Sequence, residues 1–158
     1  MGIWQSLWKF IDEFMRDVTA FGGFFFTGLV VLATFALGYY LLSFKLILGF
    51  VILIALVVLI RMVYFRERPN RVSHTNFLER IDASSFPSLH SARVVFMVLV
   101  LGTAWPILPW LVFVGFVAVM VVYSRIYLRK HDWIDVTVGA VLGGVVFVVV
   151  NRLLGSFL

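Results

Sequence analysis

The sequence contains no cysteine and unusually few charged residues. Charged side chains make up 13% of its 158 residues, against about a quarter in ordinary soluble domains. The absence of cysteine excludes disulfides, thiol catalysis and cysteine-based zinc sites. There are only four prolines, and we find no proline-rich linker, low-complexity tract or internal repeat. These absences argue against an ordinary soluble domain and indicate a single domain.

Hydrophobic residues are present in excess and are grouped into long runs. They make up 63% of the chain, against roughly half in soluble domains. The runs are each close to the ~20 residues that a helix needs to cross a bilayer. The sequence therefore predicts an all-α integral membrane protein with about five transmembrane helices, at residues 21–42, 46–65, 88–104, 111–127 and 135–154.

The first twenty residues have a different pattern. Between residues 3 and 18, apolar side chains recur at helical spacing and polar side chains occupy the opposite face. This pattern is typical of an amphipathic helix lying in the membrane interface, or equally of a helix packed onto the rest of the protein. We therefore divide the chain into an interfacial helix at 1–20 and a transmembrane domain at 21–158. No cleavable signal peptide is expected, because the start is Trp-rich and acidic.

Five spans would place every dense polar segment on one side of the membrane. The opposite interface would carry amphipathic rings, the usual aromatic belt, at Tyr39, Tyr40, Trp105 and Trp110. On the last span, Gly139 and Gly143, with Gly144 beside them, form a small-residue face that predicts close helix packing.

The first polar segment follows the second span. Arg61 and Arg68 are separated by six residues, and Arg68 is followed by Pro69. Guanidinium groups bind phosphate oxygens bidentately and stay charged at any accessible pH. Basic residues beside a span often only anchor it, so this segment alone is a weak indication of phosphate binding.

The second polar segment begins the third span, at residues 86–92. Ser88 is a good helix cap after Pro87, so the amides of Ser88, Leu89 and His90 should point outward and unpaired. Helix starts of this kind bind phosphate, and His90 could then give a proton to a leaving oxygen. Taken alone, a capping histidine at the interface is the simpler interpretation.

The third polar segment, residues 124–135, lies between the last two spans. Arg125 offers another phosphate-binding group, and His131 offers a nucleophilic or basic nitrogen. Asp135, four residues after His131, could accept a hydrogen bond from the second ring nitrogen and fix its tautomer. Three such segments on one membrane face favour a site for phosphoryl transfer. The remaining basic residues there could widen an anionic entrance or bind a second phosphate, but a solvated rim is the simpler interpretation; they are Arg66, Arg71, Arg129 and Lys130. His74 is predicted to be a solvated loop residue, with a headgroup contact as the alternative.

Together, these segments resemble the type 2 phosphatidic acid phosphatase superfamily. Its signature is Lys-x6-Arg-Pro, then Pro-Ser-Gly-His, then Ser-Arg-x5-His-x3-Asp. This chain has Arg in place of the first Lys at position 61, Leu89 in place of the Gly, and the third motif at every defined position. The resemblance covers about residues 22–154.

The resemblance implies a role for each matching residue. His131 would attack phosphorus and form a phosphohistidine, with Asp135 orienting it. His90 would protonate the departing alcohol and then activate water. The phosphate oxygens would be held by Arg61, Arg68 and Arg125 with Ser88 and the helix-start amides, that of Leu89 included. No metal and no other cofactor is implied, and the sequence offers no obvious ligand cluster for magnesium or zinc.

The expected function is hydrolysis of a terminal phosphate from a lipid phosphomonoester or diphosphate, such as phosphatidate, phosphatidylglycerol phosphate or a polyprenyl pyrophosphate. The second motif of this chain, Pro-Ser-Leu-His at residues 87–90, also resembles the branch containing inositol phosphorylceramide synthases, so a lipid phosphotransferase is the alternative. A non-enzymatic lipid-binding protein is a third hypothesis, which an intact His90, His131 and Asp135 disfavour.

The expected partners are a lipid phosphate and membrane lipids. We interpret the net charge of +5 as attraction to anionic headgroups, and we expect no nucleic acid. Lys45 and Arg152 alone lie on the far side, so the positive-inside rule places the site in the cytoplasm. The family resemblance instead implies the extracytoplasmic face of the cell membrane, which is our expectation.

Overall fold

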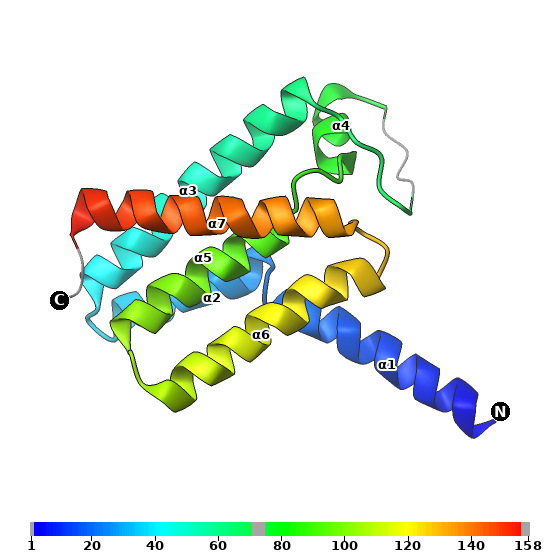
Figure 1. Cartoon of the computed structure of the whole chain (residues 1–158), viewed down its shortest axis with the longest axis horizontal. Helices are drawn as coiled ribbons and strands as arrows, with labels where there is room; N and C mark the ends of the chain where they lie inside the picture. Colours follow the sequence, from blue (N-terminus) through cyan, green and yellow to red (C-terminus); the bar gives the residue numbers. More distant parts are fainter. Residues whose placement is uncertain (1, 71–74, 156–158) are drawn as a thin grey trace.

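The computed structural model describes residues 2–70 and 75–155, so Arg71 and His74 lie outside the described part. All regular structure in that part is helical, which confirms the all-α prediction. The helices are α1 (Ile3–Ala20), α2 (Phe24–Ala36), α3 (Tyr40–Val63), α4 (Phe77–Ala83), α5 (Leu89–Ala104), α6 (Leu108–Tyr127) and α7 (Trp133–Leu154) (Figure 1).

Helix α5 forms the centre of the bundle and packs against α3, α6 and α7 (Figure 1). Phe96 and Val100 of α5 are fully buried, as are Leu46 of α3 and Val121 of α6. The outer surfaces of the long helices are also apolar; Val51 of α3 and Phe113 of α6, for example, are exposed. A bundle that is apolar inside and outside is expected of a protein whose solvent is lipid.

The close contact between α5 and α7 depends on glycine. A Cβ added at Gly139 would lie 2.4 Å from the carbonyl oxygen of Ser88, and one at Gly143 would lie 2.4 Å from that of Ala92. Both glycines are buried, whereas Gly144 has no neighbour within 4 Å of such an atom. The small-residue face predicted for the last span is therefore confirmed at Gly139 and Gly143.

We expect Gly139→Ala to destabilise the protein by about 1–3 kcal/mol, the usual range for overpacking. The new methyl group would push against the backbone of Ser88 and separate α5 from α7. Thermal unfolding of the detergent-purified protein measures the effect. Gly144→Ala is the matched control, and an equal loss in both variants would contradict the proposed packing.

The spans differ in length from the prediction. By length and composition, α3, α6 and α7 can each cross a membrane, and α1 with α2 counts as a fourth span if the two are joined across their 48° bend. Helix α5 has 16 residues and α2 has 13, both shorter than the ~20 needed. The predicted first span, 21–42, is instead α2 followed by a turn at Gly38, whose φ of 83° suits glycine.

Helix α1 is attached to the bundle by its second half. Met15 and Val18 are buried, α1 contacts α6, and the hydroxyl of Tyr127 donates to Asp12 at 2.7 Å. The first half projects away from the bundle (Figure 1), with Trp8 exposed. The packing interpretation therefore holds for the second half, and the exposed first half has the pattern of an interfacial helix.

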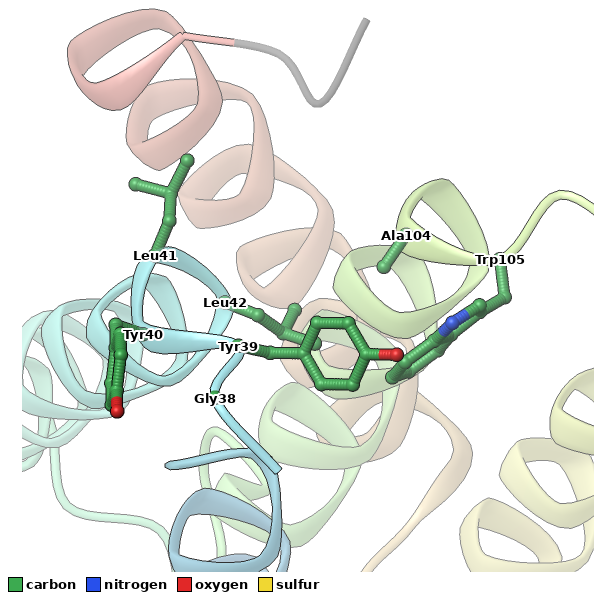
Figure 2. Close-up of a pocket in the computed structure, with 7 residues that line it drawn as sticks. All are labelled: Gly38, Tyr39, Tyr40, Leu41, Leu42, Ala104 and Trp105. Atoms are coloured by element: carbon green, nitrogen blue, oxygen red, sulfur yellow. The ribbon is translucent and has the colours of Figure 1, made fainter. Parts of the chain in front are cut away.

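Aromatic residues gather at the end of the bundle where α3 begins and α5 ends. Tyr39 points at Trp105, with ring centroids 5.3 Å apart, and both line a pocket of about 390 Å³ (Figure 2). Trp110 contacts Trp105 in turn. The pocket contains no acid, histidine or arginine among its lining residues. We interpret it as part of the predicted aromatic belt, because the polar segments lie at the other end of the bundle.

Candidate active site

Backbone hydrogen bonds join the three polar segments at one end of the bundle. The backbone N–H of Ser85 donates to the carbonyl of Arg66 at 2.8 Å. That of Asn70 donates to the carbonyl of Arg129 at 3.1 Å, and that of Ser88 to the carbonyl of Asp135 at 3.0 Å. The segments that follow α3, precede α5 and connect α6 to α7 are therefore held together independently of their side chains.

The loop between α6 and α7 fixes the position of His131. At the end of α6, the amides of Lys130 and His131 both donate to the carbonyl of Arg125. Arg129 reverses the chain there with a φ of 51°, a left-handed conformation that is uncommon for a residue with a side chain. Helix α7 then starts with a capping box between Asp132 and Asp135. His131 thus lies just before the helix rather than on its first turn.

His131 and Asp135 face each other in the interior. Nδ1 of His131 is 3.8 Å from Oδ2 of Asp135, which is too long for a hydrogen bond, and this buried Nδ1 has no other partner. Burial lowers the pKa of His131 below its usual value, and the neighbouring Asp135 opposes that shift. Because a lowered pKa favours the uncharged imidazole at neutral pH, His131 has a free lone pair there.

Arg66 holds the carboxylate of Asp135. Its Nη1 donates to Oδ1 of Asp135 at 2.7 Å, and its Nη2 donates to Asp132 at 3.1 Å. The other oxygen of Asp135 accepts the backbone N–H of Asp132. The prediction that Arg66 belongs to a solvated rim was therefore wrong. Its position two residues before Arg68, within the first motif, was the available signal.

The start of α5 offers donors to an anion, in part as predicted. Ser88 caps the helix, and its hydroxyl accepts a hydrogen bond from the amide of Ser91 at 3.4 Å. The amide of Ser88 already donates to the backbone carbonyl of Asp135 and is not available to an anion. In the described part of the chain, the amides of Leu89 and His90 have no hydrogen-bond partner. The side chain of Leu89 packs against the hydrophobic core, so it does not block its own amide.

The three predicted arginines bind neutral groups in this structure. Arg61 donates to the carbonyls of Ile81 and Pro87 at 3.2 and 3.0 Å. Arg68 donates to the carbonyl of Asp82. Arg125 donates to the hydroxyl of Thr19 at 2.8 Å.

These three guanidinium groups leave positive charge without a partner. Each retains a buried Nε with no hydrogen-bond partner, and within residues 2–70 and 75–155 none forms an ion pair with a carboxylate. Uncompensated buried charge is costly, so the cluster is suited to an anion that neutralises it.

The site residues lie close enough to influence one another electrostatically. His90 interacts with the charges of Arg125, Arg93, His131 and Arg68, and Arg61 interacts with those of Arg68 and Asp135. Direct contacts also join the motifs, since Arg61 donates to the carbonyl of Pro87 and the amide of Ser88 donates to the carbonyl of Asp135. The structure therefore brings residues of all three motifs together at one end of the bundle.

Three further residues contact this group and were not predicted. Thr19 binds Arg125, and Gly22 lies against His90, where an added Cβ would meet the imidazole at 3.2 Å. Both lie at or near the junction of α1 and α2. Arg93, one turn after His90 in α5, is 1% exposed. A charged residue within an apolar run is unusual, and this could have identified Arg93 from the sequence as a functional candidate.

The described residues contain no group of three or more His, Asp or Glu side chains that could hold a metal ion. The functional groups that the structure brings together here are two imidazoles, a buried carboxylate and several guanidinium groups.

The family model of the PAP2 superfamily matches residues 42–156. The chain belongs to the PAP2 superfamily. This membership confirms the resemblance seen in the three motifs.

Two crystal structures share the fold of this PAP2 protein. The Aquifex aeolicus LpxE structure has a TM-score of 0.76 and 23% sequence identity, covering 90% of this chain and 86% of that one. A transmembrane PAP2-type phosphatidylglycerolphosphate phosphatase from Bacillus subtilis has a TM-score of 0.74 and 24% identity, covering 91% and 76%. At these identities the likeness shows the fold alone. A search of curated proteins gave no match.

Proposed function

We propose that this PAP2 protein is an integral membrane lipid phosphatase that releases a terminal phosphate through a phosphohistidine at His131. The observation that carries the proposal is the clustering of two imidazoles with unpaired guanidinium nitrogens beside a buried carboxylate. Family membership supports a lipid phosphatase, and the apolar bundle supports substrates that reside in the membrane.

In the proposed first step, Nε2 of His131 attacks phosphorus, since Nδ1 faces Asp135. The bond from phosphorus to the leaving oxygen breaks, and His90 gives that oxygen a proton. The charge on the phosphoryl oxygens is stabilised by Arg61, Arg68 and Arg125 with the free amides at the start of α5.

In the second step, His90 takes a proton from water, and the resulting oxygen attacks the phosphohistidine. The phosphorus–nitrogen bond breaks, free phosphate leaves, and His131 returns to its uncharged form. The carboxylate of Asp135, held by Arg66, stabilises the positive charge that the ring carries while it is phosphorylated. No step requires a metal ion.

We expect purified protein to release phosphate from lipid phosphates in the presence of excess chelator. The assay compares phosphatidate, phosphatidylglycerol phosphate and a polyprenyl diphosphate in mixed micelles. A second series adds an acceptor lipid alcohol. Transfer to that alcohol in place of free phosphate would favour the phosphotransferase alternative. Tight lipid binding without turnover of any of the three would contradict the enzyme.

We also propose that the site faces the extracytoplasmic side of the cell membrane. The chain has no cysteine of its own, so a single Thr75→Cys substitution gives an unambiguous probe in the segment between α3 and α4. Labelling by an impermeant maleimide in intact cells is the expected result. Labelling only after permeabilisation would place the site in the cytoplasm.

A further inference from the structure

Arg93 is a buried cation that the proposed chemistry does not use. It is 1% exposed, and its Nη1 has no hydrogen-bond partner. Its Nε is 3.5 Å from the carbonyl of Leu89, at the limit of a hydrogen bond. Within the described part of the chain no carboxylate pairs with it. An ionisable side chain inside a membrane helix is costly and is a functional candidate by default.

The guanidinium group lies on the membrane side of the candidate active site. Arg93 follows His90 by three residues, which places both on the same face of α5 about one turn apart. It is close enough for charge interactions with His90 and Arg125. The ring of Phe24, the first residue of α2, covers it at 4.0 Å. Arg93 therefore lies between the phosphate-binding end and the lipid-facing part of the bundle.

Beyond Arg93, the same face of α5 borders an apolar groove. The groove has a volume of about 320 Å³ between α2, α5 and α6, and Met97 and Leu101 of α5 are among its lining residues. Phe21, next to Gly22 in sequence, lines it near the site. Along α5 the side chains thus change from imidazole to guanidinium to hydrocarbon. A lipid diphosphate has the same order of groups: a terminal phosphate, an inner phosphate and a hydrocarbon chain.

We propose that Arg93 binds the inner phosphate of a lipid diphosphate, and that this site prefers diphosphates to monophosphates. The inference rests on the proposed function. In a phosphomonoester such as farnesyl monophosphate, the group directly next to the reacting phosphorus is an uncharged alkoxy group, which would leave Arg93 unpaired. In a diphosphate, an anionic group occupies that position and neutralises it.

The reaction itself places charge beside Arg93. Nε2 of His131 forms a bond to the outer phosphorus, and the bond from that phosphorus to the bridging oxygen breaks. The electron pair remains on the departing lipid monophosphate, and His90 supplies its proton. Water then releases the outer phosphate from His131. Arg93 thus interacts with charge that grows on the leaving group, so its loss should lower kcat and kcat/KM together.

The test compares farnesyl diphosphate with farnesyl monophosphate, which share one hydrocarbon chain. We expect the wild type to prefer the diphosphate. Arg93→Gln should lower kcat/KM for the diphosphate by roughly 10- to 100-fold, the range for a charged hydrogen bond, and leave the monophosphate within about threefold. Arg93→Lys should recover part of the preference, since it restores charge without the planar fork. Phe24→Leu, which removes the ring over Arg93, should keep the preference.

The monophosphate rate reports whether each variant is folded and competent. An equal loss on both substrates would overturn the inference and make Arg93 a structural residue. An unchanged preference for the diphosphate in Arg93→Gln would also overturn the inference. The proposed function would still hold in that case, because the protein would hydrolyse both substrates. If the wild type hydrolysed neither farnesyl substrate but released phosphate from phosphatidate, this inference would fail and the proposed function would stand. If it hydrolysed no lipid phosphate at all, both would fail.

Discussion

Replacing His131 with alanine is expected to abolish phosphate release, with kcat falling by roughly 10⁴-fold or more, as when a covalent nucleophile is removed. His131 is the one histidine of the described cluster that faces a buried carboxylate, across 3.8 Å from Nδ1 to Oδ2. His90, the second residue of α5, instead has its imidazole against Gly22. Phosphate release from the best substrate of the wild type measures the loss.

Two controls separate loss of the nucleophile from loss of the fold. Trp133→Ala changes a residue that is 65% exposed two positions away, and it should retain activity. Wild-type protein incubated with a lipid carrying a labelled terminal phosphate should hold label after an alkaline quench, and His131→Ala should not. Labelled His131→Ala protein, or a residual rate above a few per cent, would show that another group is the nucleophile.

The site residues that could be predicted are those whose residue type and spacing the chemistry requires. Arg125, His131 and Asp135 can be recognised from the sequence because phosphoryl transfer needs a cation, a nucleophile and a carboxylate near one another. All three lie within one short segment of the chain. The position of Arg66 within the first motif places it near the candidate site, but the residues around it do not identify its partner. That partner, Asp135, lies 69 residues later.

The contacts of Thr19 and Gly22 are equally invisible in the sequence. Both depend on how α1 turns into α2 and packs beside α5 and α6, and a threonine followed by glycines in an apolar run has no pattern of its own. The same holds for Arg61. Its spacing predicts a phosphate ligand, and in this structure its terminal nitrogens bind the carbonyls of Ile81 and Pro87, contacts that only the fold creates.

The fold was predictable where composition decides it. Long apolar runs predicted α6 and α7 close to their observed bounds, because a helix is the form that satisfies its backbone in lipid. Helix α3 begins at Tyr40, six residues before the predicted start of the second span at residue 46. Composition could not show that the run at 21–42 is interrupted. The interruption comes from backbone geometry at Gly38 and from the bend that separates α1 from α2.

Replacing Asp135 with asparagine is expected to lower kcat by roughly 10²- to 10⁴-fold, the upper figure being that for the histidine-orienting aspartate of serine proteases. Asparagine keeps the shape but loses the charge that would stabilise a phosphorylated imidazole. The carboxylate also raises the pKa of His131 against the effect of burial. Its removal should therefore lower that pKa further and move the acid limb of the pH profile of kcat/KM to lower pH. An unchanged acid limb, or full activity, would contradict the pairing.

Arg66→Gln tests whether Arg66 acts through that carboxylate. The arginine side chain is 28% exposed and its partner is fully buried, so we expect a smaller loss, roughly tenfold, for a charge-assisted bond at the edge of solvent. In the Asp135→Asn background, the same substitution should add little, because the carboxylate that Arg66 positions is already gone. Additive losses would mean that Arg66 contacts the substrate itself. Non-additive losses would make it a positioning residue, whose effect reaches phosphorus only through Asp135 and His131.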